Sequence, residues 1–198
     1  MEALNLYLFS MMNATPQSPQ WLLGLANMLA VYAIFLVPLV MVIGWLRRDE
    51  ERHRLMLAAL MGCGVALAIN GVIGLLWFHP RPFVMPVGYT FLHHSPDASF
   101  PSDHMTISMT VALSLLMARE TRIMGALMFA IALAVGWSRI YLGVHFPIDM
   151  MGGMLVALFG ASVARLTKPL YIKPLYRLAR GVHRRLFAAL IRRGWISR

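Results

Sequence analysis

Hydrophobic positions along this chain of 198 residues gather in long blocks, and charged positions gather between the blocks. The apolar blocks cover residues 21–46, 55–78, 104–118, 123–137 and 147–164. A helix of about 20 apolar residues is long enough to cross the hydrocarbon layer of a bilayer. The pattern therefore predicts an all-α fold, a polytopic integral membrane bundle of about five transmembrane helices.

Two amphipathic segments flank this bundle. Near the amino terminus, apolar side chains recur at helical spacing and predict a short interfacial helix: Leu4, Tyr7, Leu8, Met11 and Met12. No basic stretch precedes an apolar core there, so a cleaved signal peptide is not expected. From residue 174, one helical face is apolar and the other carries arginines; the apolar face holds Leu175, Leu178, Val182, Leu186 and Leu190. We expect a membrane-embedded domain at 1–165 and a basic cytoplasmic tail at 166–198.

The basic residues indicate how the chain is oriented. Sixteen of its 18 Lys and Arg residues fall on one side of a five-span bundle, and that side is cytoplasmic by the positive-inside rule. The exceptions, Arg81 and Arg139, fall on the outer side. The tail can either bind anionic cytoplasmic lipid or act only as retention charge. A net charge of +10 does not indicate nucleic-acid binding here, because no base-stacking platform accompanies it.

The third and fourth blocks are short. Ser102 and Arg119 bracket 16 residues, as do Arg122 and Arg139, which corresponds to about 24 Å of helix against a hydrocarbon layer of about 30 Å. We therefore expect the outer ends of both helices to begin below the membrane surface, with His104 and Arg139 at one depth in a shallow recess.

Composition agrees with a membrane protein. Hydrophobic residues make up 59% of the chain and charged residues 13%, and the mean hydropathy is +0.67. The single cysteine, Cys63, lies in an apolar block, so we expect it to pack as a small hydrophobic residue.

Two polar clusters on the outer side suit an anion. In the first, Arg81 stands between two prolines and follows His79, which suits bidentate capture of phosphate oxygens. In the second, Ser102 is placed to cap the helix that begins with Asp103 and His104. His104 could donate a proton to a departing oxygen. Taken alone, the first cluster could be a snorkelling arginine at a helix end, and the second could be a plain helix cap.

The third cluster supplies a nucleophile. Pro147 suits a first helical turn, so Asp149 can reach back to His145. A carboxylate that accepts one imidazole N–H leaves the other nitrogen free to attack. Arg139 would hold the phosphate, although His145 and Asp149 could also be a buried structural pair. Together the clusters predict a cationic site for phosphoryl transfer.

A metal centre is the rival interpretation. Ligands are abundant: His79, His93, His94, Asp97, Asp103, His104, His145 and Asp149. Two arginines would repel a divalent cation, and no HExxH-like spacing appears. We therefore expect no metal and no other cofactor.

These motifs resemble those of the type-2 phosphatidic acid phosphatase superfamily. Its Ser-Arg-x5-His-x3-Asp motif is complete from Ser138 to Asp149, and its Pro-Ser-Gly-His motif appears with Asp103 in place of glycine. Of its Lys-x6-Arg-Pro motif only Arg81-Pro82 is present, because Gly74 occupies the lysine position. The five spans and the segment 91–94 further resemble the bacitracin-resistance branch, whose members are undecaprenyl-diphosphate phosphatases.

The resemblance implies roles for the site. His145 would form a phosphohistidine, Asp149 would orient it and His104 would protonate the leaving lipid phosphate. Binding of the phosphoryl oxygens would fall to Arg81, Arg139 and Ser102. Two supporting roles are our own inference: a protonated His79 could replace the missing lysine, and Asp103 could favour protonated His104.

The implied function is removal of the terminal phosphate of undecaprenyl diphosphate at the outer face of the bacterial cytoplasmic membrane, which recycles the carrier lipid for peptidoglycan synthesis. The partners would be this polyprenyl diphosphate lipid and the bilayer, with anionic lipid at the tail. Two alternatives stay open. One is a lipid phosphatase or phosphotransferase for another substrate, such as phosphatidylglycerophosphate or diacylglycerol diphosphate. The other is a non-catalytic protein that binds or transports lipid diphosphates.

Overall fold

A computed structural model of the chain describes residues 2–47, 49–85 and 87–193, apart from the side chains of residues 190 and 191. Within these residues the fold is all-helical, as the apolar blocks predict. In chain order the elements are α1 (Glu2–Met12), α2 (Gln20–Tyr32), the 3-10 turn η1 (Ala33–Phe35), α3 (Leu36–Leu46), α4 (Glu50–Leu76), α5 (Asp103–Leu116), the 3-10 turn η2 (Arg119–Thr121), α6 (Arg122–Tyr141), α7 (Pro147–Leu186) and α8 (Ala188–Arg192).

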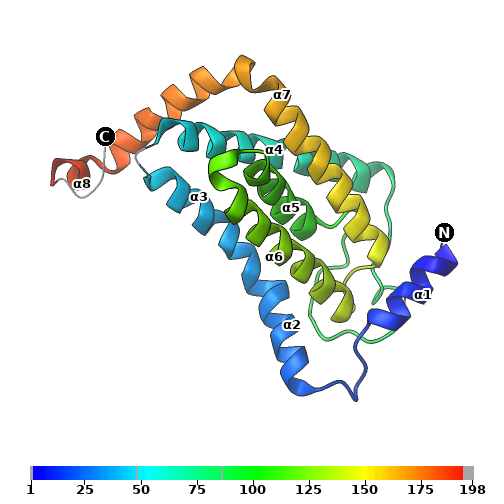
Figure 1. Cartoon of the computed structure of the whole chain (residues 1–198). Coiled ribbons are helices and arrows are strands. Elements are labelled where there is room, and N and C mark those ends of the chain that lie inside the picture. Colours follow the sequence, from blue (N-terminus) through cyan, green and yellow to red (C-terminus); the bar gives the residue numbers. More distant parts are fainter. Residues whose placement is uncertain (1, 48, 86, 194–198) are drawn as a thin grey trace.

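The short helix α5 lies at the centre of the bundle, packed against α4, α6 and α7 (Figure 1). Two of its buried hydroxyls bond to carbonyls of its own helix: Thr110 donates to Thr106 at 2.7 Å and Ser114 to Thr110 at 2.8 Å. These two polar residues are tolerated there because their hydroxyls have partners inside the protein. Small residues let neighbouring helices approach closely: a Cβ on Gly160 would lie 2.7 Å from the carbonyl oxygen of Gly62.

Four segments among the described residues are long and apolar enough to cross a membrane: Gln20–Leu46, Glu50–Leu76, Arg119–Tyr141 and Pro147–Leu186. The expected third span, α5, has 14 residues and a length of about 21 Å, so the four longer segments are the candidates for full crossings.

The expectation that the fourth span is short is wrong. Helix α6 has 20 residues and continues through Arg139 to Tyr141. The charge of Arg139 does not end the helix, because its side chain is buried in the last turn rather than placed in solvent. Of the two helices that we expected to be short, α5 is short and α6 is not. The expected recess therefore depends on α5.

The first span is interrupted. The block at 21–46 forms α2 and α3 with η1 between them. Pro38 has no N–H to donate to the carbonyl of Ile34, so the backbone tightens into a 3-10 turn just before it.

Helix α7 crosses the expected boundary between domain and tail without a break. It runs for 40 residues and contains Pro169 and Pro174. Figure 1 shows that the helix changes direction in its middle, which is the usual effect of proline inside a helix. The division at 165/166 therefore stays a prediction that no helix boundary marks.

The tail packs partly on the protein. Ile172 and Tyr176 are buried against Leu57 of α4, and Trp45 Nε1 of α3 donates to His183 Nδ1 at 3.2 Å. Other apolar side chains of the tail are exposed: Leu178, Val182 and Leu186. The side chain of Leu190 lies outside the described residues. Binding of anionic lipid by this exposed face stays a prediction.

The amino-terminal segment contacts the end of the bundle where α6 ends. Helix α1 forms as expected, with Leu4, Tyr7 and Met11 exposed, while its interfacial position stays a prediction. Just after it, Asn13 Nδ2 donates to the carbonyls of Tyr89, at 2.9 Å, and Tyr141, at 3.1 Å. One amide thus connects the long loop 77–102 to the end of α6, which holds the loop over the outer ends of the helices.

Candidate active site

Most of the predicted site residues line one cavity of about 810 Å³: Arg81, Asp103, His104, Arg139 and His145. It lies where α4 and α6 end, where α5 begins and where loop 77–102 covers them. Its polar lining is Arg81, His94, Asp97, Asp103, His104, Arg139 and His145. Asn70 also lines the cavity, and it lies 75 positions before His145 in the sequence.

His145 is held at both ring nitrogens. Nδ1 lies 3.2 Å from Asp149 Oδ2, as predicted, and Arg81 Nη1 lies 2.9 Å from Nε2. Because a carboxylate only accepts and a guanidinium only donates, Nδ1 carries the proton and Nε2 carries the lone pair. The nitrogen available for attack is therefore Nε2.

The charge state of His145 suits a nucleophile. The ring is 2% exposed, in the connection between α6 and α7. Burial lowers the pKa of His145 to about 3; the hydrogen bond to Asp149 opposes this shift, and the charges of Arg139 and Arg81 add to it. The imidazole is therefore neutral at physiological pH and keeps its lone pair.

Asp149 organises the residues around His145. Its Oδ2 accepts from the backbone N–H of Phe146 at 2.7 Å and from the hydroxyl of Ser99. Its own carbonyl accepts the N–H of Ser102 at 3.1 Å. Ser99 was missed by sequence reasoning because it lies in an irregular loop and belongs to no motif. Only the folded loop brings it to Asp149, where it is fully buried.

Arg81 is anchored by several groups of the loop. Nε donates to Asp97 Oδ1 at 2.7 Å, and Nη1 donates to the carbonyl of Val144 at 2.9 Å. Although burial raises the pKa of Asp97, the hydrogen bond and charge of Arg81 outweigh it, and the pKa is lowered. Asp97 is therefore ionised. Sequence reasoning considered it only as a metal ligand, whereas here it positions the guanidinium beside His145.

Arg139 and Ser102 have polar atoms without partners. Arg139 is 2% exposed, and only its Nη1 finds an acceptor in the described part of the chain, the carbonyl of Ala30 at 3.3 Å. Ser102 precedes α5 at the predicted cap position, but its fully buried hydroxyl makes no cap bond and no other hydrogen bond there. Buried polar groups of this kind are costly unless a ligand satisfies them. Arg139 lines the cavity, so an anion bound there could satisfy its free N–H groups; Ser102 does not line it.

Of the other three predicted residues, His104 and Asp103 line the cavity and His79 does not. His104 lines the cavity from the first turn of α5. Asp103 also lines it and accepts from Asn70 Nδ2 at 2.7 Å, a partner that sequence reasoning missed. His79 does not line it: its ring packs against Phe146, with centroids 5.9 Å apart. The structure therefore does not bring His79 to the position of the missing lysine.

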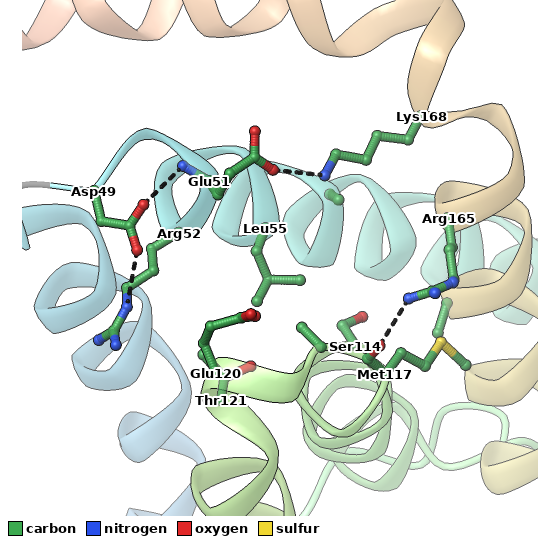
Figure 2. Close-up of a pocket in the computed structure, with 13 residues that line it drawn as sticks. Asp49, Glu51, Arg52, Leu55, Ser114, Met117, Glu120, Thr121, Arg165 and Lys168 are labelled. Atoms are coloured by element: carbon green, nitrogen blue, oxygen red, sulfur yellow. Dashed lines mark hydrogen bonds and ion pairs between the residues drawn. The ribbon is translucent and has the colours of Figure 1, made fainter.

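A second cavity lies at the opposite ends of α4 and α5, among the basic residues (Figure 2). Its charged side chains are largely occupied: Arg52 pairs with Asp49, Lys168 pairs with Glu51, and Arg165 donates to the carbonyl of Met117 at 2.9 Å. No histidine lines it, so it lacks the histidine nucleophile that the motifs predict.

A metal centre was the main alternative to a phosphoryl-transfer site without a metal. Across the residues that the structure describes, no three His, Cys, Asp or Glu side chains come together in an arrangement that could hold a metal ion. The acidic residues of the outer cavity instead bond to Arg81, Asn70 and Ser99.

The fold is that of an all-helical integral membrane protein, and its cavity gathers histidines, arginines and aspartates from the three motifs and the loop. The sequence profile of the PAP2 superfamily matches residues 55–170, more than half of the chain. The chain belongs to this superfamily of phosphatases, which confirms the resemblance drawn from the three motifs.

Individual relatives agree. The chain is 40% identical over 196 residues to YbjG of Escherichia coli (strain K12), whose name gives it provisionally as an undecaprenyl-diphosphatase, covering 99% of this chain and 98% of that protein. It is 36% identical over 128 residues to the undecaprenyl-diphosphatase BcrC of Bacillus subtilis (strain 168), covering 64% and 65%.

Solved structures show the same fold. The crystal structure of Aquifex aeolicus LpxE matches with a TM-score of 0.64 at 26% identity, over 81% of this chain and 94% of that one. A PAP2-type phosphatidylglycerolphosphate phosphatase from Bacillus subtilis matches with a TM-score of 0.65 at 22% identity, over 86% and 87%.

Replacement of Ser99 tests the support of Asp149. In Ser99→Ala the carboxylate loses one donor worth about 1.5–3 kcal/mol, so we expect kcat for release of phosphate from a lipid phosphate to fall about ten- to a hundredfold. The control is Ser114→Ala, which removes a buried hydroxyl at the far end of α5. An unchanged kcat in Ser99→Ala, or an equal loss in the control, would contradict this role.

Proposed function

We propose that this chain hydrolyses the terminal phosphate of undecaprenyl diphosphate to give undecaprenyl phosphate. The observation that carries the proposal is the neutral His145, fixed between Asp149 and Arg81 in a cavity where Arg139 has N–H groups without a partner among the described residues. Relatives named as undecaprenyl-diphosphatases support the choice of substrate. The reaction would recycle the carrier lipid for peptidoglycan synthesis.

The first step transfers the phosphoryl group to the enzyme. Arg81 moves its Nη1 donor from His145 to a phosphoryl oxygen, which frees Nε2. Nε2 then attacks the terminal phosphorus, a P–N bond forms, and the P–O bond to the lipid phosphate breaks. His104 gives a proton to the departing oxygen. Asp149 stabilises the charge that develops on the imidazole.

The second step releases inorganic phosphate. Water attacks the phosphohistidine, the P–N bond breaks, and the electron pair returns to Nε2. The proton that water loses goes to His104, which restores the acid for the next cycle. Arg81, Arg139 and Ser102 hold the three equatorial oxygens in both steps.

The apolar wall of the cavity suits a prenyl chain. Helix α4 contributes Leu67, Gly71 and Leu75 to the lining, and Phe78 follows just after the helix. Leu75 is 87% exposed and Phe78 58% exposed, at the surface that faces lipid in a membrane-spanning helix. A lipid diphosphate could therefore place its headgroup among the arginines while its chain remains along α4.

We place the cavity at the outer face of the bacterial cytoplasmic membrane and the tail in the cytoplasm. The support is the separation of charges: the described basic residues other than Arg81 and Arg139 lie between α3 and the first turns of α4, around η2, and from Arg165 of α7 to the end of α8 and just beyond it. Arg48 and Arg198 lie outside the described residues.

The nucleophile is tested by His145→Ala. We expect the variant to fold, as judged by its melting curve in detergent, and to lose phosphate release from undecaprenyl diphosphate almost completely. Full activity would eliminate His145 as the nucleophile. If the wild type loses activity in EDTA and regains it with a divalent ion, the metal alternative is favoured instead.

A substrate panel in the same assay separates the remaining alternatives. Faster release from phosphatidylglycerophosphate or diacylglycerol diphosphate than from undecaprenyl diphosphate would point to another lipid phosphatase. Tight binding of undecaprenyl diphosphate with no release would point to a binding or transport protein.

The α4 wall is tested by Gly71→Leu. A side chain at Gly71 would meet nothing within 4 Å and would project where the cavity is open. We expect KM for undecaprenyl diphosphate to rise about tenfold, equivalent to about 1.4 kcal/mol, with a smaller change for a short prenyl diphosphate.

The matched control for this variant is Gly64→Leu, on the same helix. Gly64 also has nothing within 4 Å, and it does not line the cavity. Equal KM values in Gly71→Leu and Gly64→Leu would show that the lipid does not follow this wall.

Orientation is tested with single cysteines. The native Cys63 is buried, so an introduced thiol dominates labelling by a membrane-impermeant maleimide. In spheroplasts we expect His93→Cys to be labelled at once and Leu178→Cys only after the membrane is opened. The reverse order would overturn the proposed topology.

A further inference from the structure

The charges of the cavity do not balance a diphosphate. Arg81 and Arg139 line it, but so do Asp97 and Asp103, and Asp149 lies behind His145. With neutral histidines these five groups sum to a net negative charge. A lipid diphosphate brings roughly two further negative charges at neutral pH. Favourable binding therefore requires a positive charge that the unliganded site lacks, and protonation of a histidine is the available source.

His145 cannot supply this charge, because its Nε2 lone pair is needed for attack. His104 is the proposed acid: its protonated form brings the net charge of the site only to zero, which leaves the charges of the diphosphate unbalanced, and its proton then leaves with the product. His79 lies outside the cavity, and its ring packs on Phe146. Among the described residues that line the cavity, His94 is the histidine that has no assigned role.

His94 is well placed for a headgroup. Its ring lies 6.3 Å from that of His145, measured between centroids, with 73° between the planes. Its Nδ1 lies 3.1 Å from the carbonyl oxygen of Ser95. A carbonyl only accepts, so Nδ1 carries the proton of the neutral ring and Nε2 is a lone pair. Phosphate oxygens also accept, so a neutral His94 has no donor for them, whereas a protonated one does.

We propose that His94 is a phosphate-binding residue that takes up a proton when the diphosphate headgroup enters the cavity. The proposal rests on the proposed function and names a further contact in that site. The protonated ring keeps Nδ1–H on Ser95 and donates Nε2–H to a phosphate oxygen. It thereby supplies a cationic contact in a cavity where Gly74 occupies the lysine position of the motif and brings no charge.

The groups that face His94 explain the coupling. Arg81 and Asp97 approach it from the loop, Arg139 from α6, His104 from α5, and His145 from the connection before α7. Burial lowers the pKa of His94 in the unliganded site, and the two arginines lower it further, against the Ser95 carbonyl and Asp97. A bound diphosphate offsets the arginine charges, so the pKa rises and a proton enters.

Asp97 has a positioning role in this arrangement. Its Oδ1 lies 2.7 Å from Arg81 Nε and 3.7 Å from His94 Nδ1. One carboxylate oxygen therefore lies near both groups and offsets the repulsion between Arg81 and a protonated His94. Ser95 Oγ fixes the second oxygen of Asp97 at 3.0 Å.

The test measures KM and kcat for undecaprenyl diphosphate between pH 6 and pH 9. In wild type, log KM should rise with pH over the range where the complex holds the extra proton and the free enzyme does not. In His94→Gln we expect KM at pH 6 to rise about tenfold or more, with kcat little changed. The slope of log KM against pH should fall by about one. His93→Gln is the matched control, because the adjacent His93 is exposed and does not line the cavity.

A permanent charge provides the rescue. Gly74 lines the same cavity, and a Cβ there would make only an ordinary 3.4 Å contact with Ala98. Gly74→Lys in the His94→Gln background should restore a low KM and keep it nearly independent of pH to about pH 9. If His94→Gln proves unstable in detergent, Gly74→Lys in the wild-type background should by itself flatten the pH dependence.

Calorimetry separates this proposal from the proposed function. Binding of a non-hydrolysable prenyl methylenediphosphonate in two buffers of different ionisation enthalpy should show about one proton fewer taken up by His94→Gln than by wild type. Equal proton uptake, an unchanged KM, or a loss confined to kcat would overturn the role of His94. Absence of phosphate release by the wild type would instead overturn the proposed function.

Discussion

The structure of the site depends on one buried carboxylate. Asp149 accepts hydrogen bonds from Ser99 in the loop and from His145 and Phe146 before α7, and its backbone carbonyl fixes Ser102 at the start of α5. A fully buried carboxylate is costly unless donors bond to it; here they all bond to Oδ2, and Oδ1 has no partner among the described residues. The same bonds that solvate this charge therefore set the positions of the nucleophile and of the helix that carries the proposed acid. Removal of Asp149 would disturb three elements at once.

The rest of the cavity is organised for an anion that the protein does not contain. Arg139 and Ser102 are buried with polar atoms that have no partner among the described residues, and Arg81 lies against Nε2 of the proposed nucleophile. A site of this kind is preorganised, because its donors are fixed before the substrate arrives and need little reorganisation in the reaction. In the proposed reaction, the contact of Arg81 with His145 means that Nε2 becomes available when a phosphate takes over the guanidinium.

Much of this arrangement could be predicted from the sequence. The spacing of Arg139, His145 and Asp149 is local, so the turn before α7 brings His145 to Asp149 as expected. The apolar blocks predict the helices, because helix length and hydrophobicity are properties of short segments. The end of α6 was misjudged at Arg139, because burial in the fold, rather than the charge itself, decides whether the helix continues.

The remaining contacts could not be predicted, because the loop that carries them has no periodic pattern. Ser99, Asp97 and His94 gain their roles only when residues 77–102 fold over the helix ends. His79 belongs to the same motif as Arg81, yet its ring turns towards Phe146 while Arg81 faces the cavity. Nearby positions in an irregular segment can therefore serve different surroundings.

The amide of Asn13 has a consequence for biogenesis. It bonds to Tyr89, 76 positions later in the sequence, and to Tyr141, 128 positions later. Helix α1 is synthesised first, but these contacts can form only after the loop and α6 have been synthesised. Contacts of such long range form late in folding. A nascent chain that has inserted only its first helices thus has no closed chamber. Phosphatase activity can arise only once most of the polypeptide is in the membrane.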